Sequence, residues 1–252
     1  MMRYLSQPNI MFSKLNTLIA SIALSLILTS PVAAEKKVED FHTWAGIEMI
    51  GDLSGINPNF KNFKYKLFAQ GRFGDNSTRF TQALIRPGIG YAINKKITVW
   101  LGYDWVPTSR PLALKDSFND HRIWQQLSLK DNYTIGTVIS RTRLEQRFFD
   151  IPGSTDVAYR YRQLFKLSTP MPSVSLKVSF VIWNELFVDL NTTDAGIKSG
   201  LNQNWAFAGI GYHINKQTIV EIGYLNQYIN RPKSSRPDQM FHVLSVNMLM
   251  NF

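Results

Sequence analysis

The chain has 252 residues, of which 44% are hydrophobic and 13% aromatic, with 28 Lys and Arg against 18 Asp and Glu. It contains no cysteine, which excludes a disulfide framework, a thiolate metal site and a cysteine nucleophile. The basic excess, a net charge of +10, is spread through strand-like segments and not clustered in one run, so we expect no nucleic-acid partner.

The first 34 residues are predicted to be a signal peptide. Lys14 precedes an apolar run over residues 17–28, and Val32, Ala33 and Ala34 have the spacing of a signal-peptidase site. The apolar run is too short to span a bilayer comfortably as a helix. We therefore expect cleavage after Ala34 and a single domain over residues 35–252, with translation starting at Met1 or Met11.

The rest of the chain alternates between apolar and polar residues, as strands with two different faces do. The pattern is clear in residues 65–73, 97–105, 174–182 and 244–252. No second long apolar stretch follows the signal, which excludes helical membrane spans. A soluble β-sandwich also alternates, but strands of this length with few charges on one face favour a barrel. The predicted fold is all-β, a transmembrane antiparallel β-barrel of 10–12 strands.

Eleven segments are predicted to be strands. They are residues 41–50, 62–73, 79–92, 97–107, 120–129, 134–148, 157–168, 174–190, 201–214, 218–230 and 239–252. Single-chain bacterial barrels normally have an even number of strands. Either residues 41–50 lie outside the ladder, which gives ten strands, or one strand is missed, which gives twelve; twelve is slightly favoured.

The last residue, Phe252, ends an alternating strand, and a terminal aromatic residue resembles the recognition signal of bacterial outer-membrane barrels. We therefore expect export to the Gram-negative outer membrane. The expected partners are outer-membrane lipid, lipopolysaccharide and, through the C-terminal strand, the barrel-assembly machinery. With the C-terminus in the periplasm, the Asn94-Lys95 and Asn215-Lys216 turns and residues 170–172 fall on the periplasmic side.

An internal repeat has a spacing of 121 residues. Residues 88–95 (Gly-Ile-Gly-Tyr-Ala-Ile-Asn-Lys) recur as residues 209–216 (Gly-Ile-Gly-Tyr-His-Ile-Asn-Lys), and His121 recurs as His242. The constant spacing predicts two half-barrels, although convergent hairpin chemistry is an alternative. Asn in each short turn fits a position with positive φ.

Charged residues recur at every second position of several predicted strands, such as residues 141–147. An Arg facing hydrocarbon near the membrane midplane costs about 2–4 kcal/mol, so these side chains are predicted to face the lumen. The predicted set is Arg72, Arg86, Arg141, Arg143, Glu145, Arg147, Arg160, Arg162, Lys177, Glu185 and Glu221. They form either a structural salt-bridge network or a cationic lining that selects or binds anionic solutes.

Two tryptophans, Trp100 and Trp183, are predicted by strand parity to face inward beside charged residues. Most other aromatic residues fit girdles at the membrane boundaries. Trp100 and Trp183 are therefore candidate ligand contacts.

Several motifs together resemble one family. They are Arg141–Phe148 (Arg-Thr-Arg-Leu-Glu-Gln-Arg-Phe), Tyr159–Arg162, Gly209–Tyr212 and Glu221–Tyr224, with Trp44, Gln70–Phe73 and Arg86–Gly88. They resemble the outer-membrane barrel family catalogued as domain of unknown function 2490 (DUF2490), and Arg-x-Arg-x-Glu-x-Arg is the most specific piece. The resemblance implies a bacterial outer-membrane barrel with no established activity.

The preferred function is a structural role or narrow small-solute passage that favours anions. The alternative is a rim hydrolase acting on lipid or peptide through His121 or His242, because Asp120 and Ser117 lie near His121 in the sequence. Adjacent strand residues point to opposite faces, so Asp120 would not orient His121 directly. We favour interfacial histidines without enzymatic activity, and expect no cofactor and no metal site.

Overall fold

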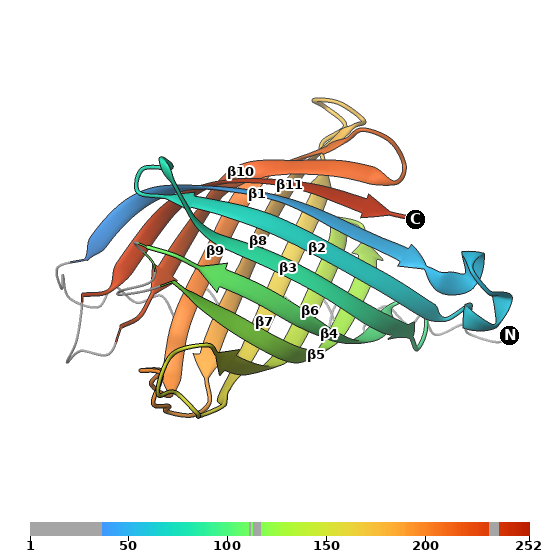
Figure 1. The fold of residues 1–252 in the computed structure, drawn as a ribbon. Helices are drawn as coiled ribbons and strands as arrows, with labels where there is room; N and C mark the ends of the chain where they lie inside the picture. Colours follow the sequence, from blue (N-terminus) through green and yellow to red (C-terminus); the bar gives the residue numbers. More distant parts are fainter. Residues whose placement is uncertain (1–36, 111, 113–116, 232–236) are drawn as a thin grey trace, which may run out of the picture. The chain divides into compact units, whose positions relative to one another are not determined.

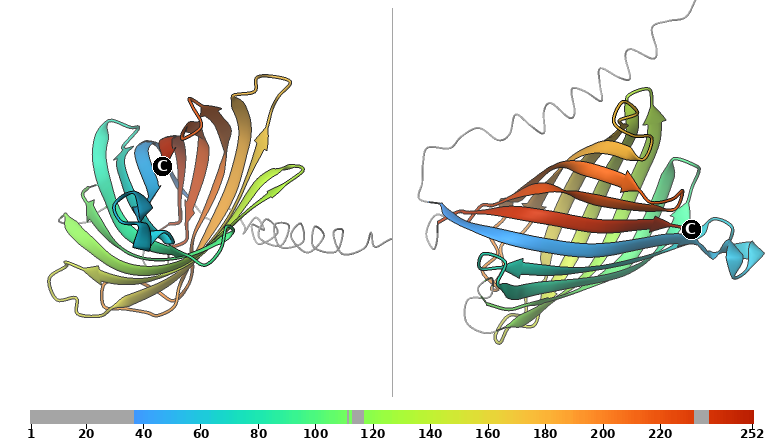
Figure 2. Two further views of the ribbon diagram at one scale, coloured as in Figure 1. Left: turned by 90° about the vertical axis from the view of Figure 1, so that its right-hand side faces the viewer. Right: turned by 90° about the horizontal axis from the view of Figure 1, so that it is seen from above.

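The computed structural model describes residues 37–110, 112, 117–231 and 237–252, which form eleven strands closed into a barrel (Figures 1 and 2). The strands are β1 (Val38–Asp52), β2 (Phe63–Gly74), β3 (Arg79–Ala92), β4 (Ile97–Thr108), β5 (Phe118–Tyr133), β6 (Gly136–Phe149), β7 (Ala158–Pro170), β8 (Val178–Asp189), β9 (Gly200–His213), β10 (Thr218–Ile229) and β11 (Gln239–Asn251). Two short 3-10 helices, η1 (Leu53–Gly55) and η2 (Pro58–Phe60), connect β1 to β2. No helix within these ranges is long and apolar enough to cross a membrane. The predicted signal peptide, residues 1–34, lies outside the described residues.

All eleven predicted strand segments are found, but the expected even strand number is wrong. β1 belongs to the ladder: it pairs in parallel with β11, from Val38 opposite Gln239 to Ile50 opposite Asn251, and antiparallel with β2. Because consecutive strands alternate in direction, an odd number brings the first and last together in the same direction. The even-number expectation assumed antiparallel closure. The parallel closure, called here the seam, places the start of β1 and the end of β11 at opposite ends of the barrel (Figure 1).

The connections fall into two groups, one at each end of the barrel. β2, β4, β6, β8 and β10 finish at the end where β1 begins, called here the N end, and its fully described connections are residues 75–78, 150–157 and 190–199. The end where β11 finishes, called here the C end, has those over residues 53–62, 93–96, 134–135, 171–177 and 214–217. The two Asn-Lys turns and residues 170–172 therefore share one end, as predicted.

Strand alternation separates the two faces of the wall as the sequence indicates. Outward residues such as Leu101, Ile123 and Leu127 are 45–52% exposed. Inward residues such as Trp124 and Val181 are fully buried. Apolar side chains thus cover the outside of the barrel, and the inside contains most of the buried charge.

The 121-residue repeat is reproduced in the barrel. β3, β4 and β5 begin at residues 79, 97 and 118, and β9, β10 and β11 begin at residues 200, 218 and 239, each 121 positions later. The repeated glycines leave no space for a side chain: a Cβ at Gly102 would lie 2.1 Å from Trp124, and one at Gly223 would lie 2.4 Å from the Ala208 carbonyl oxygen and 2.8 Å from the Phe207 ring. The repeat therefore conserves a backbone that an inward ring can approach closely.

The predicted positive φ at the Asn-Lys turns is wrong. Among the described non-glycine residues, positive φ occurs at residues 75–77 of the β2–β3 hairpin. The Asn94 side-chain oxygen instead accepts hydrogen bonds from the backbone N–H groups of Lys96 and Ile97, at 2.8 and 2.9 Å. Asn215 makes the same pair of contacts in the second repeat. Asn therefore suits these turns because its side-chain oxygen accepts hydrogen bonds from the backbone of the turn.

Candidate functional site

A cavity of 1430 Å³ occupies the inside of the barrel. Near the C end its wall includes Lys64, Lys95 and Asn251, and near the N end it includes Ser117 and Asp150. The cavity therefore extends over most of the length of the strands. Within the described residues its wall includes thirteen Lys and Arg side chains and five Asp and Glu side chains. This interior cavity is the candidate functional site.

Glu145 and Glu185, two buried acidic residues inside the barrel, are each bound by more than one arginine. Glu145 on β6 accepts hydrogen bonds from Arg160 and Arg162 on β7, the shortest at 2.5 and 2.6 Å. Glu185 on β8 bridges Arg162, at 2.8 Å, and Arg141, at 2.7 Å. Glu145, Glu185 and the arginines Arg141, Arg160 and Arg162 thus form a continuous chain across β6, β7 and β8. Because each carboxylate is held by arginines from other strands, the chain stiffens this wall.

A second cluster lies on β3, β4 and β5. The Asp104 carboxylate receives two hydrogen bonds from Arg86, at 2.7 and 2.8 Å, and one from the Trp124 indole, at 2.6 Å. Two parallel bonds from one guanidinium fix the orientation of both partners. Asp120 similarly accepts from Arg122 and Arg147, each at 2.6 Å.

Ten of the predicted lumen residues contribute to the cavity wall. They are Arg72, Arg86, Arg141, Arg147, Arg160, Arg162, Glu185, Glu221, Trp100 and Trp183. The inward direction that parity predicts for Trp100 and Trp183 is therefore confirmed. Glu221 is joined to Lys166 by an ion pair of 2.5 Å.

Three predicted lumen residues do not line the cavity. Arg143 and Glu145 are 1% exposed and lie within the packed wall, where the Arg143 guanidinium covers the Trp124 ring at 4.3 Å. The prediction that Lys177 faces the lumen is wrong. The strand predicted over residues 174–190 begins only at Val178, so Lys177 is an exposed residue of the preceding turn. The alternation in residues 174–177 is short and does not distinguish a strand end from a turn.

The structure adds residues that the sequence analysis did not include in the site. Asp120, which the hydrolase alternative places beside His121, points inward and pairs with Arg122 and Arg147. Asp120, Arg122, Trp124 and Gln126 occupy alternate positions of β5, and this pattern was the available signal.

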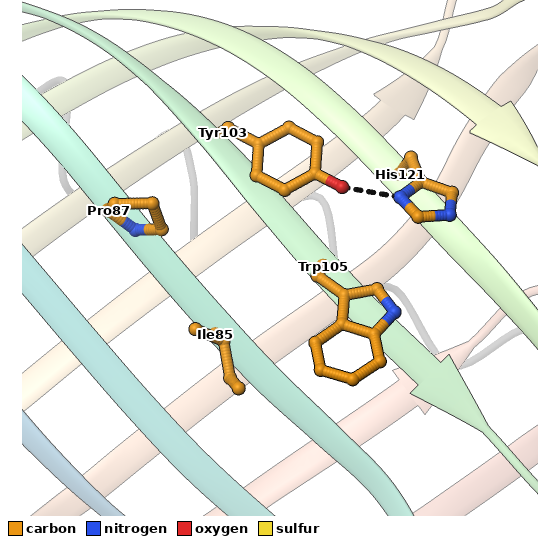
Figure 3. Close-up of a pocket in the computed structure, with 5 residues that line it drawn as sticks. All are labelled: Ile85, Pro87, Tyr103, Trp105 and His121. Carbon is orange, nitrogen blue, oxygen red and sulfur yellow. Dashed lines mark hydrogen bonds between the residues drawn. The ribbon is translucent and has the colours of Figure 1, made fainter.

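The histidines of the hydrolase alternative lie on the outer surface of the barrel. Ile85, Pro87, Tyr103, Trp105 and His121 form an open groove of 330 Å³ there (Figure 3). The Tyr103 hydroxyl group hydrogen-bonds with His121 Nδ1 at 2.5 Å, and the repeat partners Tyr224 and His242 do so at 2.7 Å. In the described part of the chain, no Ser, Asp or Glu side chain hydrogen-bonds with His121, so no Ser-His-acid arrangement forms there. Nor do the described residues contain three or more His, Asp or Glu side chains grouped to hold a metal ion.

The fold and its interior define a closed all-β barrel with a charged cavity. The family described as "Protein of unknown function (DUF2490)" matches residues 41–238. An uncharacterized protein of Methylorubrum extorquens is 31% identical over 232 residues, which are 91% of this chain and 96% of that protein. No solved structure gives a significant match. The chain belongs to the DUF2490 family, a family of unknown function.

Proposed function

We propose that this protein is a Gram-negative outer-membrane barrel that allows small solutes, preferentially anions, to pass through its interior. The observation that carries the proposal is the 1430 Å³ cavity, whose wall runs along the strands and has more cations than anions. A wall with excess positive charge attracts anions and repels cations, and the surrounding low dielectric strengthens both effects.

The outer surface supports the membrane part of the proposal. Large apolar side chains are exposed around the barrel, for example Ile89, Leu101 and Leu144. Such a continuous apolar surface is unstable in water and stable in lipid. Gln125 and Gln146 are outward polar residues, and their side-chain amides bond to each other in both directions at 3.1 Å, which reduces the cost of placing them in hydrocarbon.

Localisation and partners follow from the same proposal. Residues 1–34 act as a cleaved signal peptide, Phe252 serves the barrel-assembly machinery, and lipopolysaccharide surrounds the outer half of the barrel. Two features support this: a closed ladder that leaves no free sheet edge, and an apolar outer face. Mass spectrometry of protein from an outer-membrane fraction tests this, with Glu35 expected as the first residue; an intact Met1 or Met11 terminus would contradict it.

Planar-bilayer recording tests the passage itself. In a gradient of KCl the wild type is expected to conduct, and its reversal potential is expected to lie closer to the equilibrium potential of chloride than to that of potassium. Arg141→Gln removes one cation from the cavity wall and is expected to reduce this displacement. The substitution does not leave Glu185 unpaired, because Arg162 remains its partner. Arg79→Gln is the matched control, because Arg79 is an exposed residue at the end of β3 that does not line the cavity.

Two results would contradict the proposal. A barrel that inserts into the bilayer and stays silent has a structural role only. A barrel that conducts equally well for potassium and chloride has no selection by its charged wall.

A further inference from the structure

The interior of the barrel is divided into two different walls. Strands β3 to β7 supply the charged clusters around Asp104, Asp120 and Glu145. The adjoining arc of β8 to β11 and β1 supplies an apolar cluster, which consists of Trp44, Val181, Phe187, Trp205, Phe207, Leu225, Ile229, Phe241 and Val243. A path for inorganic ions alone does not require such an apolar wall, because hydrated ions gain nothing from contact with it.

Arg72 on β2 lies beside this apolar wall. Its guanidinium carbon is 3.9 Å from the centre of the Trp44 ring and 5.3 Å from that of Trp205. The two tryptophans contact each other edge to face, with ring centres 5.0 Å apart. Cation–π contact holds the guanidinium against the rings and leaves its positive charge in place.

Arg72 also differs in its polar partners from six other arginines of the cavity wall. Its Nε and Nη1 groups donate to the side-chain oxygens of Gln70 and Gln82, at 2.8 and 2.7 Å. In the described residues it makes no ion pair with Asp or Glu, whereas Arg86, Arg122, Arg141, Arg147, Arg160 and Arg162 each do.

Arg72 thus keeps an uncompensated charge beside aromatic rings. The side chain is half-buried and borders the cavity, and its Nη2 group makes no hydrogen bond within the described residues. The buried indole N–H of the adjacent Trp44 also has no hydrogen-bond partner there. A planar cation with a free donor suits a carboxylate oxygen, and the rings beside it suit an apolar body.

We propose that the cavity binds small organic anions in which a carboxylate is attached to an apolar, aromatic body. The carboxylate pairs with Arg72, and the body lies against Trp44 and Trp205. Because the ligand is placed on the path described above, the inference deepens the proposed function and rests on it for its biological meaning. An inorganic anion can use the Arg72 charge but not the rings, and a neutral aromatic molecule can use the rings but not the charge.

Isothermal titration calorimetry on the detergent-solubilised mature protein tests the site with benzoate as the probe. Benzoate is expected to bind saturably, and acetate and benzamide, which lack the ring and the charge respectively, are expected to bind at least about tenfold more weakly. Arg72→Gln is expected to weaken benzoate binding by about tenfold or more, while Arg79→Gln leaves it unchanged.

Several outcomes would overturn the inference: no saturable benzoate binding, equal binding of acetate, or full affinity in Arg72→Gln. If Arg72→Gln does not fold, the wild-type comparison of benzoate with benzamide and acetate decides the question alone. The calorimetry requires no membrane passage, so the two proposals fail separately. A silent barrel that binds benzoate contradicts passage only, and an anion-selective barrel that ignores benzoate contradicts the ligand class only.

Discussion

Asp104 illustrates how single residues hold the interior together. Its carboxylate is fully buried and receives three hydrogen bonds from Arg86 and Trp124. Strand parity is sufficient to predict that Asp104 points inward. The partners are not predictable in the same way, because they depend on the register between β3, β4 and β5, which no local pattern specifies.

Asp104→Asn is expected to lower the free energy of unfolding by about 3 kcal/mol, because it leaves the buried Arg86 charge without its counter-ion. Denaturant titration of the barrel in micelles measures the change. Asp52→Asn is the control: the Lys64–Asp52 pair is partly exposed to solvent, so its loss is expected to cost less than about 1 kcal/mol. Equal effects of the two substitutions would show that burial of the Asp104 cluster has no special importance.

Asp194 acts at the residue scale outside the strands, where it joins two connections of the N end. Its carboxylate accepts hydrogen bonds from the Thr155 backbone N–H, at 2.8 Å, and from the Ser154 hydroxyl, at 2.7 Å. The Thr155 N–H, followed by the Ser154 hydroxyl, holds the pKa of Asp194 below its ordinary value of 3.8. A lowered folded-state pKa stabilises the contact fully above the ordinary pKa, and this stabilisation is lost as the pH falls through the folded-state value.

The Thr155 amide is therefore expected to remain protected from hydrogen exchange between pH 7 and pH 5, and to lose protection only below the ordinary range of a carboxyl group. Asp194→Asn is expected to expose the same amide already at pH 7. Loss of protection in the wild type at pH 6 would contradict the contact as described.

At the scale of elements, the strands were predictable and their closure was not. β3 is predicted with both boundaries correct, because residues 85–91 alternate clearly and turn residues flank the strand, although a β-bulge near Phe80 shifts its register with β2. Closure by β1 and β11 joins residues about 200 positions apart, and the choice between a parallel and an antiparallel seam leaves no trace in either strand's pattern. The eleven segments therefore give the correct number of strands, and the general rule of an even number does not hold for this barrel.

The seam can be tested by cross-linking, since the native chain has no cysteine. Ala45 and Val246 are register partners across the seam and lie at outward positions of β1 and β11. The double variant Ala45→Cys, Val246→Cys is expected to form a disulfide on oxidation, seen as a mobility change on non-reducing gels. Ala45→Cys with Met250→Cys shifts one cysteine four residues along β11, about 13 Å, and is expected to stay reduced. Cross-linking of the shifted pair instead would contradict the parallel register.

At the scale of the whole molecule, the interior combines a stiff charged wall with a cavity that extends along the strands. The sequence predicts inward charge correctly except at Lys177, but it does not distinguish Arg143, which is sealed in the wall, from Arg141, which borders the cavity. Both have the same parity on β6. The difference arises because Arg143 packs on Trp124 and bonds to Gln126, both contributed by another strand.

Passage through the barrel requires the cavity to be a continuous aqueous path from the N end to the C end. Leu164, in the middle of β7, lines the cavity and is not part of the ion-pair clusters. In a Leu164→Cys variant, a negatively charged methanethiosulfonate reagent added to either side of a planar bilayer is expected to reduce the current, while the cysteine-free wild type is unaffected. Reaction from one side only, or from neither, in a barrel that has inserted would contradict a continuous path.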